Sequence, residues 1–381
     1  MRHLTVIAAG LGYGLLERRG LLRMAGLSFA AAPSVFPAVT CVAQASLRTG
    51  LAPAAHGMVS NGVWMDDLRK PLFWEQSSRL VKGRRVWEDR RAAGGTVGLY
   101  FLQQSLGEDV DQIVSPAPIH KHGGGMVMSC YVKPSDCAQE LARRAGTFPL
   151  WRYWGPLASP KVGRRCIAWF ERLTEIADVD EAYLYLPTLD YAAQKHGPGS
   201  PADGAALAEL RRQLEYLADL CQRRGCALDV TGDYEITPVT APPELPNVVL
   251  RRAGLFRTRS VGGRAYPDFH QSAAFAMCDH EFCALYGPES ARAEELLLSS
   301  GGYERPPEGA PLPPGCRILL AKAGSWCDYR WWTDSREAPD FASHVDIHNK
   351  PGYDPRELFF FNRGTVKGTH GRQSAVAKSN G

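Results

Sequence analysis

The chain has 381 residues, of which 45% are hydrophobic and 22% are charged, and its 44 basic residues exceed its 40 acidic residues by four. This composition excludes global disorder and allows one large α/β domain with an insertion, or two domains. So small a charge excess argues against a nucleic acid polymer as partner, and no stretch is apolar enough to span a bilayer. The ten cysteines include no Cys-x-x-Cys pair, which favours reduced thiols in a cytoplasmic protein.

The first predicted element is a core strand over residues 4–9, followed by a glycine-rich turn. Residues 33–61 then place Thr40 between a proline-stiffened approach and a short helix that ends at Gly50. A helix N-terminus presents unpaired N–H groups and the positive end of the helix dipole, both of which favour a phosphoryl group. Thr40 is therefore a candidate for phosphoryl chemistry, although an N-capped surface helix would explain this residue alone.

Two later segments read as helix-then-strand units of a parallel sheet. Apolar side chains at helical spacing predict helices over residues 167–177 and 207–221, with Gly225 as the stop signal of the second. The strands that follow are predicted over residues 181–186 and 227–231.

A carboxylate follows each of these strands. Asp190 comes just after the first and Asp233 just after the second. Because ligands bind at the carboxyl ends of strands in parallel α/β sheets, we expect both carboxylates to lie at the same edge as Thr40.

The pattern changes after residue 238, where the predicted elements become shorter and a proline-rich linker occupies residues 305–315. We predict a core domain of residues 1–238 and 345–381 and an inserted cap domain of residues 239–344. The last ten residues are polar and are expected to fray.

The nucleophile segment carries a family resemblance. Thr40 stands ten residues before Gly50. Gly50 belongs to the run of residues 49–57, which reads Thr-Gly-Leu-Ala-Pro-Ala-Ala-His-Gly. This run resembles the nucleotide pyrophosphatase/phosphodiesterase (type I phosphodiesterase) branch of the alkaline phosphatase superfamily. The resemblance implies an α/β fold with a mostly parallel central sheet between helices and a smaller α+β cap. It also implies a hydrolase that uses Thr40 to attack a phosphodiester, pyrophosphate or phosphonate bond of a small phosphorylated substrate, with Gln44 and Asn61 as substrate-binding candidates.

The resemblance further implies a centre of one or two divalent metal ions, with zinc favoured and manganese or magnesium as alternatives. Such ions would activate the nucleophile and the water that releases the phospho-enzyme. Three of the six side-chain ligand positions keep the expected residue, namely Asp190, Asp233 and His370. Gln194 stands where a histidine is expected, and His196 is the candidate substitute for it.

The losses fall mainly on the nucleophile side of the centre. Ala9 stands where an early aspartate is expected, and Tyr234 stands where a histidine is expected. That side keeps only Asp233 and Thr40, so a single metal, or a magnesium or manganese ion near Asp233 and Glu235, is easier to defend than two zinc ions.

Other acidic and imidazole groups occur in pairs and could compensate. Asp279 with His280 and Asp346 with His348 are the strongest of these candidates, since a carboxylate commonly orients a metal-binding histidine by accepting its other ring N–H. Each of them is more often a surface or capping residue. His56 is expected to order the loop after the nucleophile helix by hydrogen bonding.

Two alternative functions stay open. A protein that kept the fold and lost its metals would act as a ligand-binding or scaffold protein, which Ala9 and Tyr234 favour and which Thr40 and His370 oppose. A third hypothesis uses Cys41 as the nucleophile, since a thiolate is stabilised at a helix start. It lacks a base partner nearby in the sequence.

Overall fold

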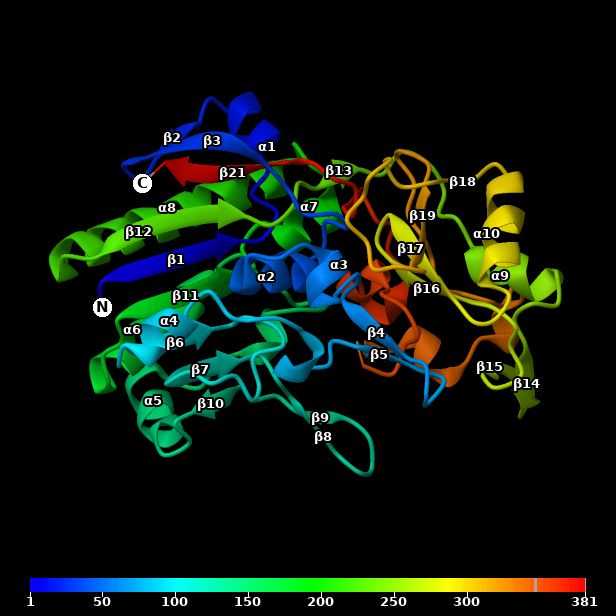
Figure 1. Cartoon of the computed structure of the whole chain (residues 1–381), viewed down its shortest axis with the longest axis horizontal. Coiled ribbons are helices and arrows are strands. Elements are labelled where there is room, and N and C mark those ends of the chain that lie inside the picture. The colour runs from blue at the N-terminus through cyan, green and yellow to red at the C-terminus, as the bar shows by residue number, and fades with distance from the viewer. Residues whose placement is uncertain (346–347, 381) are drawn as a thin grey trace.

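The computed structural model describes residues 1–345 and 348–380. Its largest unit is a nine-stranded sheet with the spatial order β10-β7-β6-β11-β1-β12-β21-β3-β2 (Figure 1). The strands of this sheet, in chain order, are β1 (His3–Ala8), β2 (Arg23–Met24), β3 (Leu27–Pro33), β6 (Val97–Tyr100), β7 (Gln112–Ser115), β10 (Tyr131–Lys133), β11 (Glu181–Leu186), β12 (Ala227–Gly232) and β21 (Ala375–Asn380).

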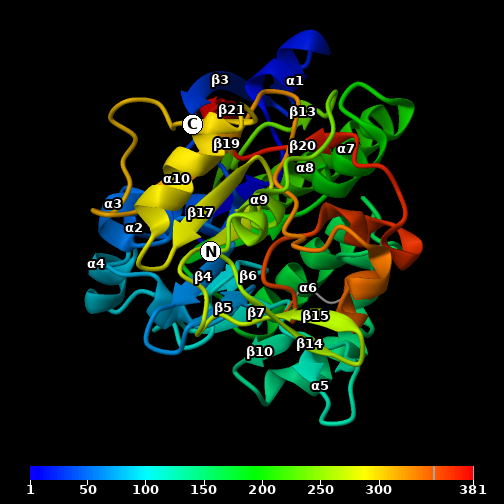
Figure 2. The same ribbon diagram turned by 90° about the vertical axis from the view of Figure 1, so that its right-hand side faces the viewer.

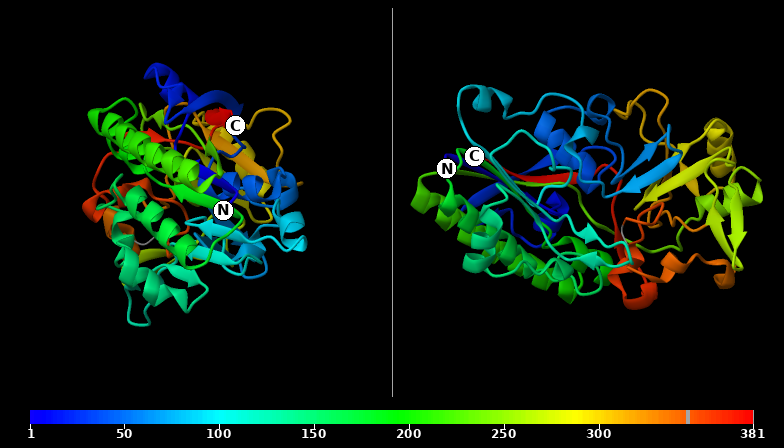
Figure 3. Two further views of the ribbon diagram at one scale, coloured as in Figure 1. Left: turned by 90° about the vertical axis from the view of Figure 1, so that its left-hand side faces the viewer. Right: turned by 90° about the horizontal axis from the view of Figure 1, so that it is seen from below.

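The middle of this sheet is parallel, as predicted. Strand β1 pairs in parallel with β11 on one side and β12 on the other, and β6 continues the parallel run to β7. The pairs at both ends of the sheet are antiparallel. Helices α6 (Val162–Ile176) and α8 (Pro201–Arg224) cover one face of the sheet, and α2 (Thr40–Thr49) lies on the other (Figure 3).

Helix α8 shows how local sequence fixes these elements. The Ser200 side chain accepts the N–H of Asp203, and Pro201 occupies the first helical position. Gly225 ends the helix with a left-handed φ of 65°. Between these caps, leucines at helical spacing, among them Leu210 and Leu214, are fully buried against the sheet.

A second, four-stranded sheet has the order β16-β17-β19-β18 and lies beside α9 and α10 (Figure 2). Its elements are β16 (Phe275–Asp279), β17 (Phe282–Tyr286), β18 (Tyr303–Glu304), β19 (Arg317–Ala321), α9 (Pro246–Arg252) and α10 (Ser290–Ser299). All of them fall within the predicted cap of residues 239–344. The domain boundaries themselves stay a prediction.

The β16–β17 hairpin directs its turn toward the main sheet. Asp279 pairs with Phe282, so that His280 and Glu281 form the turn, and the N–H of Glu281 donates to the His370 carbonyl at 3.0 Å. The hairpin therefore brings the second sheet to the C-terminal segment of the chain.

Besides short 3-10 helices, the described chain contains further short α-helices and two-stranded ribbons. They are α1 (Tyr13–Arg18), α3 (Pro53–His56), α4 (Glu88–Ala92), α5 (Cys137–Ala145) and α7 (Asp190–His196), and the ribbons β4 (Gly62–Met65) with β5 (Lys70–Phe73), β8 (Ile119–His120) with β9 (Met126–Val127), β13 (Thr237–Pro238) with β20 (Gly368–Thr369), and β14 (Thr258–Val261) with β15 (Arg264–Pro267). Within the described ranges, no helix is long and apolar enough to cross a membrane.

The expected fraying of the last ten residues is wrong. Residues 375–380 form β21, which pairs with β3 over six residues and also meets β12. The Ser379 hydroxyl accepts the N–H of Val230 at 2.8 Å. Val376 and Ala377 are buried in the sheet while Lys378 is exposed, so the apolar residues of this terminal segment supply a partly buried strand.

Candidate functional site

The predicted convergence at one edge of the sheet is present. Thr40 is the first residue of α2, and Asp190 is the first residue of α7, just beyond β11. Asp233 directly follows β12. Because β11 and β12 both flank β1 in parallel, their carboxyl ends lie side by side. The three side chains are all buried.

Tyr234 links the nucleophile candidate to a carboxylate. Its hydroxyl donates to Asp190 Oδ1 at 3.0 Å and lies 3.4 Å from Thr40 Oγ1. Since a carboxylate only accepts, the phenol proton points to Asp190 and the phenol oxygen is free to accept the Thr40 hydroxyl. The three groups thus form a buried hydrogen-bonded chain.

Asp190 is surrounded by side-chain donors. Gln194, one helical turn later on α7, donates from Nε2 to Asp190 Oδ1 at 2.6 Å, and the Tyr353 hydroxyl donates to Gln194 Oε1 at 3.1 Å. Burial raises the pKa of Asp190 to about 6, although the hydrogen bonds from Gln194 and Tyr234 oppose this shift. Asp190 is therefore largely ionised at neutral pH.

Asp233 is held by the main chain instead. Its Oδ1 accepts the N–H of Gly10 and the N–H of Tyr234, each at 2.9 Å, and the Tyr185 hydroxyl lies 3.5 Å from Oδ2. Burial raises the pKa of this carboxyl well above its usual range, and the hydrogen bond from Gly10 opposes the shift. The end of β12 packs closely against the turn after β1, because a Cβ at Gly232 would lie 2.1 Å from the carbonyl oxygen of Leu11.

His370 belongs to a stack of four buried rings, here called the ring column. Its ring is parallel to that of Tyr234 at 3.6 Å between centroids, and it lies 3.6 Å from His280, which in turn lies 4.0 Å from Tyr353. The Nδ1–H of His370 donates to the Ala38 carbonyl at 2.8 Å. Burial lowers the pKa of His370 to about 3 and that of His280 well below its usual range, so both imidazoles are neutral at pH 7.

The two substrate-binding candidates differ in availability. Asn61 Oδ1 accepts the Cys41 N–H at 3.0 Å, while its own N–H and Nδ2 donate to Asp279, so Asn61 holds the start of α2. Gln44 Oε1 accepts the Gln103 N–H at 2.7 Å. The Nε2 of Gln44 is buried without a hydrogen-bond partner among the described residues, one turn after Thr40. Gln44 therefore keeps a donor for a ligand.

Asp279 is a structural anchor. Besides Asn61, its carboxylate accepts the Ser60 hydroxyl at 2.8 Å. Burial raises its pKa to about 6, and the hydrogen bonds from Asn61 and Ser60 oppose this shift. Asp279 thus connects the turn of the second sheet to the loop after α2.

The expectation for His56 is confirmed, because its Nε2 lies 2.9 Å from the Ser46 hydroxyl and its Nδ1 accepts the Met58 N–H at 3.1 Å. Cys41 is fully buried, and burial raises the pKa of its thiol far above the usual range. The thiol is therefore poorly suited to form the thiolate that the third hypothesis requires.

Three of the other candidates take no part in the hydrogen bonds among Thr40, Tyr234 and Asp190. His196 is exposed at the end of α7, and Glu235 pairs with Arg18 at 3.0 Å. The ring of His348 lies edge-on to His120 at 4.6 Å, and His348 lines the same cavity as Tyr353.

The donors present do not fit the implied metal centre. Across residues 1–345 and 348–380, no group of three His, Cys, Asp or Glu side chains could hold a metal ion, and Asp346 lies outside the described residues. Ala9 is buried and offers no donor, and the phenol of Tyr234 stands beside Thr40. Asp233 Oδ1 already accepts two main-chain N–H groups.

Sequence reasoning missed Tyr353 and Gln103. Tyr353 closes the ring column and holds Gln194, and together with Gln103 it lines a cavity that also includes Trp154 and Tyr191. The density of aromatic residues around Trp154 was a signal for this cavity, but nothing in the sequence connected it with Thr40.

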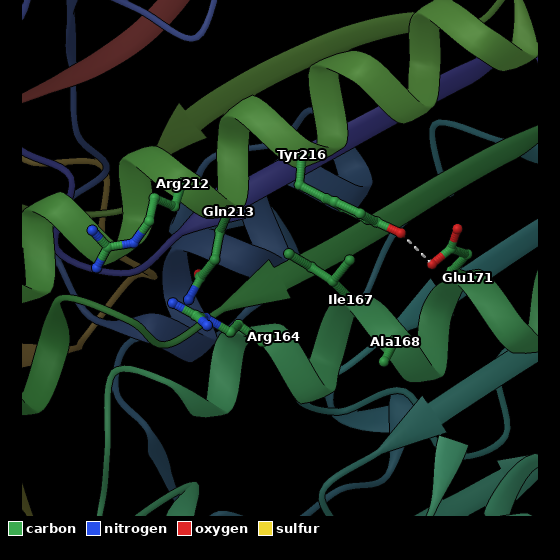
Figure 4. A pocket seen from close by; sticks show the side chains of 7 residues that line it. All are labelled: Arg164, Ile167, Ala168, Glu171, Arg212, Gln213 and Tyr216. Carbon is green, nitrogen blue, oxygen red and sulfur yellow. Dashed lines mark hydrogen bonds between the residues drawn. The ribbon is translucent and has the colours of Figure 1, made fainter. Parts of the chain in front are cut away.

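A separate groove of about 370 Å³ runs between α6 and α8 (Figure 4). The Tyr216 hydroxyl donates to Glu171 at 2.7 Å across it, and Arg164, on its rim, pairs with Glu209. None of the lining residues belongs to the Thr40 site.

Comparison with known proteins identifies a matching family and similar solved structures. A family model described as type I phosphodiesterase/nucleotide pyrophosphatase matches residues 10–354. Phosphonoacetate hydrolase from Sinorhizobium meliloti 1021, solved with phosphonoformate, has a TM-score of 0.63 and 16% identity over 100% of this chain and 89% of its own. Murine ectonucleotide pyrophosphatase/phosphodiesterase 5 gives 0.56 and 15% over 100% and 88%. A search of curated protein sequences gave no match.

Proposed function

The chain belongs to the type I phosphodiesterase/nucleotide pyrophosphatase family, a family of hydrolases, and from this premise we propose a phosphoryl-transfer hydrolase with Thr40 as its nucleophile. The observation that carries the proposal is the position of Thr40 at the first residue of α2, with its hydroxyl 3.4 Å from a phenol that donates to Asp190. The substrate is a small molecule with a phosphodiester, pyrophosphate or phosphonate bond. The family predicted from residues 40–57 is confirmed, while the role of Thr40 is proposed.

The surroundings of Thr40 support binding of a phosphoryl group. The N-terminus of α2 carries a partial positive charge, and the buried Nε2 of Gln44 is a donor without a partner in the described structure. Attack by Thr40 Oγ1 would form a phosphothreonine ester and break the bond to the leaving group, which takes a proton from water. Hydrolysis of the ester would then release phosphate, or the monoester, and restore the hydroxyl.

A divalent metal, with zinc favoured, stays a prediction for this chain. The family generally depends on divalent metals, but the donors around Thr40 in the described residues do not fit such a centre, so the proposed reaction does not involve one. Elemental mass spectrometry of protein purified without chelator measures the metal content per chain. One or two equivalents would support a metal centre, and none after reloading would oppose it.

Replacement of the nucleophile tests the proposal. We expect Thr40→Ala to reduce hydrolysis of nitrophenyl phosphodiesters, pyrophosphates and phosphonates by about 10³-fold or more, because no other buried hydroxyl contacts Tyr234 among the hydrogen bonds of the described residues. Thr40→Ser, which keeps the hydroxyl, is the matched control. Circular dichroism would verify that both variants fold, and activity that survives in folded Thr40→Ala would contradict the proposal.

The second candidate is a ligand-binding protein without turnover. It is favoured by Ala9 and Tyr234, which leave the nucleophile side without the expected ligands. Saturable binding of phosphorylated ligands that is unchanged in Thr40→Ala, with no turnover under any metal condition, would support this function over the first.

A further inference from the structure

Tyr234 is the best-positioned side chain of the site. Its main-chain N–H donates to Asp233 at 2.9 Å, and its ring is stacked on His370 with an interplanar angle of 1°. The side chain is 1% exposed. Backbone and ring are thus fixed independently, which holds the hydroxyl in place before any ligand arrives.

The hydrogen bonds of this hydroxyl have a direction. Asp190 Oδ1 accepts the phenol proton at 3.0 Å and also accepts Gln194 Nε2 at 2.6 Å. The phenol oxygen therefore presents its lone pair to Thr40 Oγ1, 3.4 Å away. This contact is long, as catalytic hydrogen bonds often are before a substrate binds.

We propose that Thr40 is activated by a relay through Tyr234 to Asp190, in place of a metal ion at the nucleophile. This inference rests on the proposed function. As Thr40 Oγ1 bonds to phosphorus, its proton passes to the Tyr234 oxygen and the Tyr234 proton passes to Asp190, while the leaving group departs with its bonding electrons. When water later cleaves the ester, the attacking water loses a proton to solvent, and the relay proton returns along the same path to Thr40. Tyr234 and Asp190 end the cycle as they began it.

The surroundings support a relay over a metal at this position. A phenol occupies the position beside Thr40, and displacing it would also separate the parallel rings of Tyr234 and His370. Asp233 already accepts two main-chain N–H groups, and Ala9 supplies no donor. The residues around Thr40 therefore do not supply the ligands that the family's metal would need at the nucleophile.

A fluorophosphonate probe tests the relay without knowledge of the substrate. Such a probe phosphonylates an activated hydroxyl with loss of fluoride, and peptide mass spectrometry locates the adduct. After dialysis against chelator, we expect the wild-type chain to be labelled at Thr40. Tyr234→Phe, which keeps the stacked ring and removes the hydroxyl, should be labelled about 10²-fold more slowly. Tyr303→Phe, which removes a buried hydroxyl in the second sheet, should match the wild type.

Asp190→Asn is the second variant in case Tyr234→Phe misfolds. Its side-chain oxygen can still accept Tyr234 and Gln194, but it is a poor proton acceptor, so labelling should again slow by about 10²-fold. Wild-type labelling that requires added zinc or manganese, no labelling at all, or an unchanged rate in folded Tyr234→Phe would overturn the relay. Turnover in Thr40→Ala would overturn the proposed function instead, so the two failures are distinguishable.

Discussion

Asp190 and Asp233 are the same residue type at the ends of two strands that flank β1, yet they are held in opposite ways. Asp190 accepts side-chain donors from Gln194 and Tyr234, whereas Asp233 accepts main-chain N–H groups from Gly10 and Tyr234. A hydroxyl donor such as that of Tyr234 can redirect its proton between Asp190 and Thr40 without moving its ring. Main-chain N–H donors cannot change direction unless the backbone itself moves.

The difference separates a chemical role from a structural one. Asp190 lies one hydrogen bond away from the hydroxyl that contacts Thr40. Asp233 instead fixes the turn after β1 and the backbone at Tyr234, and so sets the position of that hydroxyl. Position at a strand end identifies both residues as candidates, but the type of donor that each accepts, side chain or main chain, distinguishes their roles.

The largest effect should come from loss of charge at Asp190. We expect Asp190→Asn to lower kcat for the hydrolysis of nitrophenyl phosphodiesters by about 10²- to 10⁴-fold, because the amide keeps the hydrogen bonds and loses the basicity. Urea unfolding should show little change in stability. Asp233→Asn is the matched control, with a loss of kcat that is much smaller, and equal losses in the two variants would break the comparison.

The next effect should be on stability at Asp233. We expect Asp233→Ala to lower the free energy of unfolding by about 2–4 kcal/mol, because two buried main-chain N–H groups would lose their acceptor. Asp190→Ala should cost less, because the Tyr234 hydroxyl proton can turn to Thr40 Oγ1, which leaves one side-chain donor, Gln194 Nε2, without its acceptor. Urea denaturation of both variants measures the difference, and the reverse order would contradict the structural role of Asp233.

A third effect extends the comparison to His56, which also accepts a main-chain N–H. Burial and the nearby charge of Arg48 lower the pKa of His56 to about 4 from its usual 6.5. Between these values the unfolded chain binds a proton that the folded chain does not, so His56 makes stability fall as pH falls through this window. The contribution of His56 to the loss of unfolding free energy between pH 7 and pH 5 should be on the order of 1 kcal/mol.

Urea unfolding at several pH values would measure this contribution of His56 as the difference in unfolding free energy between the wild type and His56→Gln. The variant should lose less stability on acidification. Identical pH dependence in the two proteins would show that His56 does not contribute.

The smallest effect should come from Tyr185, whose hydroxyl lies 3.5 Å from Asp233 Oδ2. We expect Tyr185→Phe to change the free energy of unfolding by about 0.5 kcal/mol or less, because this bond is long and the main-chain donors to Asp233 remain. A larger loss in urea would mean that side-chain donors also matter at Asp233.

The sequence predicted the elements whose signals are local. Strand β11 has the predicted bounds and β12 extends one residue further, and Gly225 ends α8 as expected. Helix α2 likewise ends at Gly50, which has a left-handed φ of 68°. The convergence of Asp190 and Asp233 followed from these bounds and from parallel topology alone.

The remaining features depend on contacts between distant segments. In the sequence Tyr234 is only a missing ligand, and its role emerges because folding brings Thr40, 194 residues away, and Asp190, 44 residues away, to one hydroxyl. The pairing of β21 with β3 joins segments far apart in the sequence, and no periodicity within a six-residue segment indicates such a partner. The ring column depends on the same long-range contacts.

The place of β21 in the sheet has a consequence for biosynthesis. In the spatial order, β21 is the strand that connects β3 and β2 to the rest of the main sheet. Until the ribosome has released residues 375–380, β3 has no bond to the parallel strands, and the segment from β3 into α2 is anchored at one side only. The segment from β3 into α2 therefore gains its pairing with the main sheet only after residues 375–380 have left the ribosome, so the Thr40 site is completed late and from a partly folded chain.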